Sequence, residues 1–550
     1  MQEIWERLKQ AIKELYGLDF EPEVTVAPEN IEADYSTNAP LKLAKELHQA
    51  PMDIAGELAQ RLEAEVTAPG FLNFILTDEF LSSEIQNLSQ NFRENISSDE
   101  YAEKVVICEF SDPNPFKVLH VGHLYTSVAG DAISRLYEYA GAKVIRANFG
   151  GDVGLHVAKT MYILQQKNPE ELTIEDIARC YVEGTAAYED DKKAHDEITQ
   201  LNKEIYKINV EKIHGTRIAD LYWRGRELSY DYFREFYARI GVKFDKFYPE
   251  STVAELGFRT VEEQLEKGVY EKSDGAVIFD GEKYGLHTRV FINREGVPTY
   301  EAKDVGLIFT KWEDYHFDKS IVITGNEQLE YMKVVLKSVE QYAPELVERT
   351  RHLTHGLVKL PGNQKMSSRK GNFLKAVDVL EMVREALENE YDSKDEIVAL
   401  AATKYAFLKY KMGGNIIFDP KESVKMTGNS GPYLLYSAVR AKKILANCRK
   451  DEVVKSGEYD KYDKYDKYER NLVKKMLEYK DVLGLAVSEM APHKLANYLY
   501  ELAQEFSRFY EKCPVVGDIR ESERAQLVKV YLDTMMHGLD LLGIEVPEEM

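Results

Sequence analysis

Cysteine is scarce in this chain of 550 residues: there are four, and no two of them form a C-x-x-C pair. Neither a disulfide framework nor a zinc site is therefore predicted. Long apolar runs are also missing, since none approaches the roughly 18 residues that a membrane helix needs. The first 15 residues carry acids in an amphipathic helical pattern, not the basic-then-apolar order of a secretory signal. We expect a cytoplasmic protein that binds no membrane and holds no tightly bound metal.

Positively charged residues are also relatively few: the chain has 71 Lys and Arg against 94 Asp and Glu, and its formal net charge is -23. A chain this acidic is not typical of proteins that coat nucleic acid without specificity. A local basic face can still bind RNA, and residues 440–480 contain 13 Lys or Arg against 8 Asp or Glu. The same stretch is equally typical of a solvated helix with internal salt bridges. Both interpretations stay open here.

The chain is too long for a single hydrophobic core, and its pattern changes along its length. Residues 1–100 are predicted to form a small α/β domain with an apolar strand at residues 70–76. A helix opens this domain and is expected to bury four residues at helical spacing, namely Ile4, Leu8, Ile12 and Leu15.

Residues 101–375 are predicted to form a Rossmann-like, doubly wound α/β domain. A buried strand at 105–110, a helix from His120 to Gly141 and a strand at Val144 make one β-loop-α-β unit. Residues of about 160–240 are charged and mostly helical, so we expect an insertion there. Strand-like segments then return at 275–279, 287–292 and 320–324. Beyond them the pattern is helical, which predicts a connector at 376–425 and an all-helical domain at 426–550.

The first motif that carries chemistry is His120-Val121-Gly122-His123, at the start of a helix that follows a buried strand. A helix amino terminus attracts phosphate, and two imidazoles there can donate hydrogen bonds to a pentavalent phosphorus transition state. Gly122 leaves room for a nucleotide base near the backbone. A pair of helix-capping histidines is the structural alternative. A zinc site would lack an evident third ligand.

The second motif is Lys-Met-Ser-Ser-Arg-Lys-Gly-Asn at residues 365–372. Hydroxyl groups between cations can close on the ATP phosphates as charge moves to the leaving pyrophosphate. Alone, the motif would be assigned to an ordinary basic surface loop. Together with H-x-G-H, it resembles the two signatures of class I aminoacyl-tRNA synthetases. The absence of a G-x-x-x-x-G-K-[ST] sequence argues against a P-loop ATPase.

Longer segments resemble the arginyl-tRNA synthetase family in particular. The resemblance covers essentially the whole chain in the family's order: 34–38 and 70–74 in the N-terminal domain, 109–123, 144–148, 151–154 and 298–304 in the catalytic domain, and 431–440, 506–514 and 538–544 in the anticodon-binding domain. It implies ATP-dependent activation of L-arginine to arginyl-adenylate. Transfer to the 3′ end of arginine tRNA would follow, with AMP and pyrophosphate as the other products.

The resemblance also assigns the arginine site. Glu109, Tyr300 and Asp304 would hold the guanidinium group, whose planar fork suits carboxylate partners. The α-amino end would be held by Asn114 and Gln328, with Ser111 nearby. A buried acidic site rejects neutral amino acids, because its carboxylates would stay unpaired, so no editing domain is expected.

ATP, with Mg²⁺ as part of the substrate, is assigned to the two motifs. The predicted ATP-binding residues are His120, Gly122, His123, Gly356, Val358, Lys365, Met366, Ser367, Ser368 and Arg369. The catalytic residues would be His120, His123, Lys117 and Lys365. Some arginyl enzymes lack the cations of the second motif, and a lysine before H-x-G-H is thought to compensate. This chain has both lysines, so their relative roles stay open.

Anticodon-loop bases are expected to contact Tyr433, Tyr436 and Arg440, because RNA bases stack on aromatic rings and bind Arg. Core packing is an equal alternative for Tyr436. The resemblance implies that the N-terminal domain contacts the tRNA corner and that activation requires bound tRNA. We expect a monomer whose partners are arginine tRNA, L-arginine and ATP.

Two other functions are weighed against this one. A class I synthetase for cysteine or glutamine would share the motifs, but the cysteine enzymes usually need zinc-ligand cysteines that are missing here. A catalytically inactive, tRNA-binding relative is the other possibility, and the two intact motifs argue against it.

Overall fold

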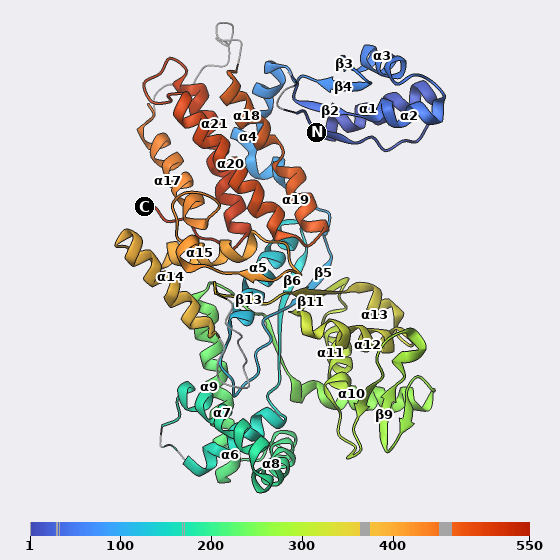
Figure 1. Cartoon of the computed structure of the whole chain (residues 1–550), viewed down its shortest axis with the longest axis vertical. Helices are drawn as coiled ribbons and strands as arrows, with labels where there is room; N and C mark the ends of the chain where they lie inside the picture. The colour runs from blue at the N-terminus through green and yellow to red at the C-terminus, as the bar shows by residue number, and fades with distance from the viewer. Residues whose placement is uncertain are drawn as a thin grey trace. The chain divides into compact units, whose positions relative to one another are not determined.

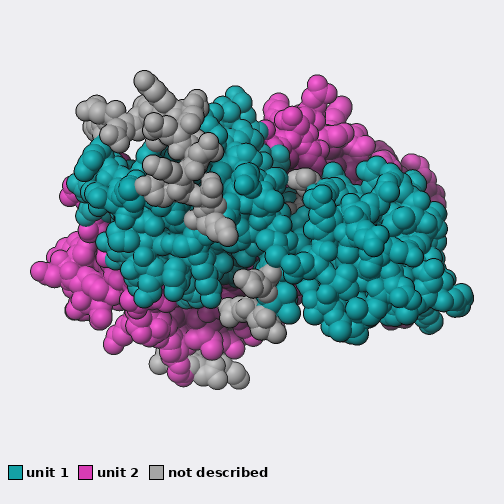
Figure 2. Space-filling model, turned by 90° about the horizontal axis from the view of Figure 1, so that it is seen from above, with its two compact units in different colours: residues 1–96, 437–485, 498–536 teal, residues 97–436, 486–497, 537–550 magenta. Residues whose placement is uncertain are grey.

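The computed structural model describes residues 2–28, 31, 33–167, 169, 171–362, 374–449 and 465–550. The chain divides into two compact units, shown in teal and magenta in Figure 2. Unit 1 contains residues 1–96, 437–485 and 498–536, and unit 2 contains residues 97–436, 486–497 and 537–550. Each unit therefore combines segments that are far apart in the sequence. Within the described residues, no helix is long and apolar enough to cross a membrane.

The amino-terminal part of unit 1 is a small α/β domain, drawn in blue in Figure 1, as the sequence predicts. Its antiparallel sheet has the order β1-β2-β4-β3. Leu15 is 41% exposed, so its predicted burial is wrong. The buried row through Leu8 and Ile12 continues instead at Tyr16, four residues on, which is partly buried against the same core. The elements are α1 (Gln2–Tyr16), β1 (Val24–Val26), β2 (Tyr35–Thr37), α2 (Ala39–Leu47), α3 (Pro51–Leu62), β3 (Glu65–Thr67), β4 (Phe71–Phe74) and α4 (Asp78–Ile96).

A five-stranded parallel sheet forms the centre of unit 2, with the order β12-β11-β5-β6-β7. The chain enters at the middle strand, moves outward on one side, and then returns to build the other side. This is the predicted Rossmann-like, doubly wound topology. Such sheets bind ligands at the carboxyl ends of the strands, where the direction of winding reverses. The strands are β5 (Val105–Glu109), β6 (Lys143–Gly150), β7 (Lys246–Pro249), β11 (Lys319–Gly325) and β12 (Thr350–His355).

Helices cover both faces of this sheet. Helix α5 packs on β5, β6 and β11 and is covered in turn by α14 and α15, which explains why it is buried on nearly all sides. On the other face, Ile107 and Ile145 share one core with α10, α11 and α12. The helices are α5 (Val121–Tyr139), α10 (Glu250–Glu266), α11 (Tyr300–Tyr315), α12 (Leu329–Glu340), α13 (Pro344–Arg349), α14 (Ala376–Tyr391) and α15 (Glu396–Leu408).

Helices α10 and α11 touch backbone to backbone through two glycines. A β-carbon on Gly257 would lie 1.9 Å from the carbonyl oxygen of Ala302. A β-carbon on Gly306 would lie 2.1 Å from a carbonyl oxygen of α10. Only glycine permits this approach, so the two helices are held at a fixed, short separation.

Two insertions interrupt the sheet. The first is helical, as predicted, and packs around Met161, Ile198 and Tyr222. The second is a separate antiparallel sheet with the order β10-β9-β8. Of the three later strand-like segments, only 320–324 joins the parallel sheet. The insertions contain α6 (Leu155–Lys167), α7 (Ile174–Asp190), α8 (Lys192–Val210), α9 (Arg217–Arg239), β8 (Glu271–Ser273), β9 (Ala276–Phe279), η1 (Gly281–Tyr284) and β10 (Arg289–Ile292). The short helix η2 (Asn326–Gln328) follows β11.

From residue 376 the described chain is almost entirely helical, as predicted. The exception is a short strand that pairs with β13. The remaining elements are β13 (Val358–Lys359), β14 (Ile416–Ile417), α16 (Pro420–Ser423), α17 (Gly431–Asn447), α18 (Lys467–Leu477), α19 (Tyr479–Ser488), α20 (Pro492–Lys512) and α21 (Glu521–Leu541).

Within unit 1, Asp34 links the amino-terminal domain to helix α18. Arg470 binds Asp34 and also donates to Asp78 at 2.7 Å, and Lys474 lies 3.2 Å from Asp34. Asp34 is 3% exposed. Burial alone would raise its pKa, but hydrogen bonds from Arg470 and the Leu76 N–H, together with the two cationic charges, bring the pKa below its ordinary value. These contacts join segments 436 residues apart.

Candidate active site

A cavity of about 950 Å³ lies at the carboxyl ends of the parallel strands, within unit 2. Eleven of the residues predicted to bind ATP or arginine line it together: Glu109, Ser111, Asn114, His120, Gly122, His123, Tyr300, Asp304, Gln328, Gly356 and Val358. They come from segments spread over 250 residues of sequence. The topology thus brings the residues of the first motif and of the predicted arginine site into one space.

His120 and His123 stand at the amino end of α5 with stacked rings, 3.7 Å between centroids. The Gly122 N–H donates to Nδ1 of His120, and the His120 N–H donates to Nδ1 of His123, both at 3.1 Å. Because each Nδ1 accepts a hydrogen bond, the ring hydrogen lies on Nε2. The histidines therefore cap the helix and also line the cavity.

Both imidazoles are neutral at physiological pH. Burial, followed by unfavourable electrostatic interactions with His355 and Lys117, lowers the pKa of His120 to about 4. Burial, followed by the repulsion that would arise if His120 and His123 were both protonated, lowers the pKa of His123 well below its ordinary value. Neutral rings with hydrogen on Nε2 can donate to phosphate oxygens without first losing or gaining a proton.

Backbone from the end of β12 to β13 forms a second wall of the cavity. The Leu357 N–H donates to Oδ1 of Asn415 at 2.8 Å, and the Leu357 side chain is 60% exposed. A β-carbon on Gly356 would lie 2.3 Å from the carbonyl oxygen of Gly414, so glycine is needed where these two segments meet. Flat backbone beside an exposed apolar side chain is a surface on which an adenine ring can lie.

Tyr300 and Asp304 lie on the first turns of α11. Asp304 accepts a hydrogen bond from the hydroxyl of Tyr331. Burial, and after it the nearby carboxylates led by Glu109, raise the pKa of Asp304 to about 7 although the Tyr331 hydrogen bond opposes this. No lysine or arginine of the described chain forms an ion pair with Asp304. Its carboxylate is therefore available to an incoming cation.

Glu109, the last residue of β5, already has an internal cationic partner. Its Oε2 lies 2.7 Å from Nζ of Lys311, which also donates to Oγ of Ser320 at 3.2 Å. The Glu109 and Lys311 residues are 3% and 1% exposed. The sequence assigned Glu109 to the substrate alone, and the lysine beneath it was missed.

The loop after β5 has an unusual backbone, with φ of 72° at Ser111 and 50° at Asp112. Ser111 Oγ lies 2.8 Å from the hydroxyl of buried Tyr237. Asn114 Oδ1 accepts a hydrogen bond from the Gly151 N–H at 2.7 Å, which leaves its NH₂ group as the donor to a ligand. Asp112, which the sequence did not single out, also lines the cavity.

Two more carboxylates in the wall were missed, and each has its own cation. Glu250 binds Lys303, whose Nζ also lies 2.6 Å from the hydroxyl of Tyr206. Glu301 lies 3.0 Å from Arg289. Glu250 follows β7 directly, at the same edge of the sheet as Glu109, and this position is a signal that sequence reasoning could have used.

Lys117 lies in a smaller hollow of about 90 Å³, which it shares with Asn114, His120 and His123. Its ammonium group is 4.9 Å from the ring centroid of Tyr181. Lys117 thus adjoins the two histidines without lining the large cavity. The predicted phosphate clamp, Lys365, Met366, Ser367, Ser368 and Arg369, lies outside the described residues.

The predicted anticodon residues share one face of α17, because Tyr433, Tyr436 and Arg440 are spaced by three and four residues. Tyr436 is 39% exposed, which argues against the core-packing alternative. The Arg440 guanidinium lies 4.6 Å from the ring centroid of Tyr510. Tyr436 and Arg440 are thus an exposed ring and a stacked guanidinium on a helix.

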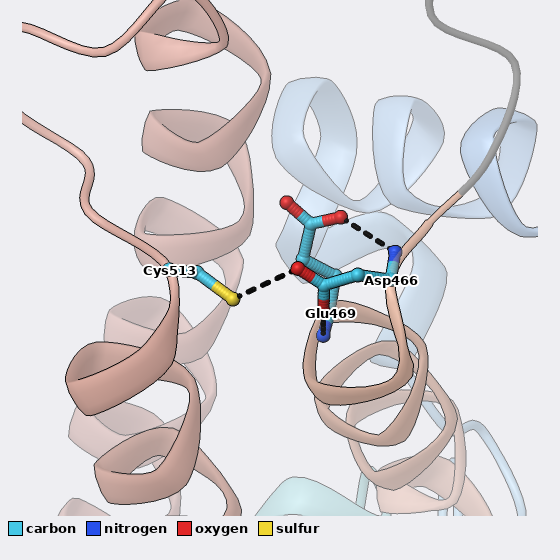
Figure 3. Close-up of side chains that lie close together, drawn as sticks. All are labelled: Asp466, Glu469 and Cys513. Atoms are coloured by element: carbon cyan, nitrogen blue, oxygen red, sulfur yellow. Dashed lines mark hydrogen bonds between the residues drawn. The ribbon is translucent and has the colours of Figure 1, made fainter.

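One group among the described residues has the spacing of a metal site, namely Asp466, Glu469 and Cys513. Figure 3 shows that the Cys513 thiol donates to Asp466, whereas Glu469 accepts from the Asp466 backbone. Both Glu469 oxygens also bind guanidinium groups, those of Arg520 and Arg524, at 2.7 Å. Two guanidinium charges on the central carboxylate make this an ion-pair network that caps α18.

Comparison with known proteins identifies the chain's class and then its family. A family model described as "tRNA synthetases class I (R), catalytic domain" matches residues 84–419, which defines a class I aminoacyl-tRNA synthetase. Models of an "Arginyl tRNA synthetase N terminal domain" and a "DALR anticodon binding domain" match residues 2–76 and 434–550. The chain belongs to the arginyl-tRNA synthetase family.

Individual relatives are similar over nine-tenths or more of their length. An arginine–tRNA ligase of Treponema denticola is 29% identical over 543 residues, 92% of this chain and 91% of the relative. One from Porphyromonas gingivalis is 28% identical over 599 residues, with 100% of both chains covered. The structure of Thermus thermophilus arginyl-tRNA synthetase covers 100% of both chains with a TM-score of 0.79 and 25% identity. A class I synthetase for cysteine or glutamine is thereby excluded.

Proposed function

We propose that this chain carries out the reaction of its family in the cavity described above. The reaction is ATP-dependent activation of L-arginine, followed by transfer to the 3′ end of arginine tRNA with release of AMP and pyrophosphate. The observation that carries the proposal is the assembly of the eleven predicted residues around one cavity at the edge of a doubly wound sheet.

ATP lies along the two walls nearest α5 and β12. The adenine ring rests against the backbone of Gly356 and Val358, and the α-phosphate meets the amino end of α5. His120 and His123 donate from Nε2 to the phosphate oxygens as charge builds up during attack by the arginine carboxylate. Lys117 and Lys365 add positive charge, and Mg²⁺ enters with the nucleotide.

Arginine lies along α11 and the end of β5. Asp304 and Tyr300 hold the guanidinium group, and Glu109 supplies the second carboxylate. Asn114 and Gln328, with Ser111 behind them, hold the amino-acid end. A neutral amino acid would leave the charge of Asp304 without a partner, which accounts for discrimination without editing.

The tRNA contacts are proposed at Tyr433, Tyr436 and Arg440 for the anticodon loop and at the N-terminal domain for the tRNA corner. Exposure of Tyr436 supports the first. The monomeric state and the cytoplasmic location stay predictions from the sequence.

A charging assay tests the proposal. Purified protein, ATP, Mg²⁺ and arginine tRNA are incubated with each of the twenty amino acids. We expect arginine alone to be attached to the tRNA, and arginine-dependent pyrophosphate exchange to require the tRNA. Tight tRNA binding without charging would instead support the inactive relative.

A further inference from the structure

Helix α11 carries a buried lysine, Lys311, seven residues after Asp304, which the reaction outlined above leaves unused. We propose that Lys311 is a positioning residue for the arginine site. It fixes Glu109 at the cavity wall and places a positive charge beside Glu109 and Asp112, so that an arginine cation meets an ordered carboxylate instead of two acidic groups that repel each other. The inference rests on the proposed function.

The geometry places Lys311 beneath the site and out of reach of the substrate. Its Nζ is shared between Glu109 at 2.7 Å and Ser320 at 3.2 Å. The side chain is 2% exposed, and Lys311 does not line the cavity, whereas Glu109 does. Ser320 belongs to β11, the strand beside β5, so the ammonium group is anchored by two neighbouring strands of the sheet.

Stability alone does not account for such a pair. Removing two charges from water costs several kcal/mol each, and replacing a buried ion pair with apolar side chains is often neutral or stabilising. A buried lysine under a cavity-lining carboxylate is better explained by its effect on the cavity. The same arrangement recurs at Lys303 with Glu250, another carboxylate of the wall.

Lys311 stands among groups that would otherwise repel one another. Asp112 from the loop after β5, Asp304 from α11 and Tyr248 from β7 all interact electrostatically with Glu109. Burial, and after it the charge of Glu109, raises the pKa of Asp112 well above its ordinary value, and Lys311 opposes this rise. When two carboxylic acids lie close together with no cation between them, repulsion between the two negative charges keeps one of them protonated.

Removing the ammonium group should therefore weaken arginine binding in a pH-dependent way. In the Lys311→Met variant, Glu109 is no longer held in place and Asp112 keeps its proton to a higher pH, so the wall attracts the substrate cation less. We expect the arginine KM to rise at least about tenfold at pH 7, and the deficit to shrink as the pH is raised to 9. The KM for ATP should stay within about twofold.

Three further variants distinguish a positioning role of Lys311 in the arginine site from a purely structural role in the fold. Lys319→Met removes another partly buried ammonium group from β11, one bound to the hydroxyls of Tyr101 and Tyr137, and should leave the arginine pH profile unchanged. Lys311→Arg keeps the charge and should restore most of the arginine affinity. Glu109→Gln combined with Lys311→Met should bind arginine no worse than Glu109→Gln alone, because both act through the same carboxylate.

The decisive measurements are calorimetric arginine binding and charging kinetics between pH 6.5 and 9. An unchanged arginine KM in Lys311→Met, or a loss that is equal for arginine and ATP at every pH, would overturn the role of Lys311. If Lys311→Met fails to fold, Lys311→Gln replaces it and must show the same pH-dependent deficit. Failure of the unmodified protein to charge tRNA with arginine would overturn the proposed function, whereas the binding comparison would still decide the role of Lys311.

Discussion

Asp304 is the residue at which a proton and the substrate compete for one carboxylate. Its pKa of about 7 in the empty site comes chiefly from burial. A guanidinium group binds the charged form, so arginine binding requires the proton to leave. Affinity for arginine is therefore full above pH 7 and is lost as the pH falls through that value.

We expect kcat/KM for arginine to fall below about pH 7, approaching tenfold per pH unit, as Asp304 takes up its proton. Asp304→Asn should raise the arginine KM about 30- to 150-fold, equivalent to roughly 2–3 kcal/mol for a charged hydrogen bond, and should remove this pH dependence. Charging kinetics at several pH values give both quantities. A steep profile that persists in Asp304→Asn would assign the titration to another group.

His120, unlike Asp304, should not change its protonation state in the assay range, because its pKa of about 4 keeps it neutral there. At saturating substrate, kcat should show no histidine step between pH 6 and 7. His120→Asn keeps a good helix cap but removes the Nε2 donor, and should slow activation about 10²- to 10³-fold with little change in melting temperature. A parallel loss of stability in thermal melts would point to capping as its main role.

The residues of the site were predictable to different degrees. His120 and His123 sit in a short motif whose chemistry can be argued from sequence, whereas Asp304 was assigned only through the resemblance to the family. Lys311 and Glu250 could not be assigned in the same way, because their partners are set by which strands lie side by side. Asp112 was not singled out beside Ser111, and two consecutive residues with positive φ give this loop a course that the sequence pattern does not reveal.

At the level of secondary structure, the contact of α10 and α11 holds the acidic wall together. Gly257→Ala would place a methyl group 1.9 Å from the Ala302 carbonyl and 3.2 Å from the Gly306 nitrogen, so the helices must separate. We expect a loss of about 1–3 kcal/mol in unfolding free energy and a larger rise in the KM for arginine than for ATP.

The matched control is Gly56→Ala in α3, where a new β-carbon would meet nothing within 4 Å. It should stabilise its helix by about 0.5–1 kcal/mol and leave both KM values unchanged. Thermal melts and charging kinetics on the two variants provide the comparison. Equal effects of both substitutions would argue against a special role for the α10–α11 contact.

Helices and strands could be predicted from the sequence where the hydrophobic periodicity is strong. The sheet that a strand joins could not be predicted, because it depends on contacts with segments far away in the sequence. The first strand-helix-strand unit and the helical insertion were predicted, because each is local in sequence. The segments at 276–279 and 289–292 form strands, but their pattern does not tell which sheet they join. These two strands form a separate antiparallel sheet because β10 pairs with β9 and not with a strand of the parallel sheet.

At the level of the whole molecule, unit 1 depends on the buried ion pairs between Asp34 and α18. Arg470→Met leaves Asp34 with Lys474 as its cation and should lower the stability of the amino-terminal domain by about 2–3 kcal/mol. Because the pKa of Asp34 is depressed, its contribution is present above about pH 4 and is lost as the pH falls further. Hydrogen exchange of β2 and β4 measures the effect.

A surface ion pair in the same domain serves as the control. Lys42 lies 2.7 Å from Glu23, with 46% and 60% of the two side chains exposed. Lys42→Met should leave exchange in β2 and β4 unchanged, because exposed pairs contribute little. If Arg470→Met also leaves exchange unaltered, the amino-terminal domain is stable without α18.

The 436 residues between Asp34 and Arg470 also have a consequence for synthesis on the ribosome. At roughly 5–20 residues per second, the amino-terminal domain emerges about 20–90 s before the helix that neutralises it. During that interval Asp34 and Asp78 lack their partner Arg470. The nascent domain must either fold on its own small hydrophobic core or remain unfolded until α18 has been made. A segment translated much later thus completes the ion pairs of the amino-terminal domain.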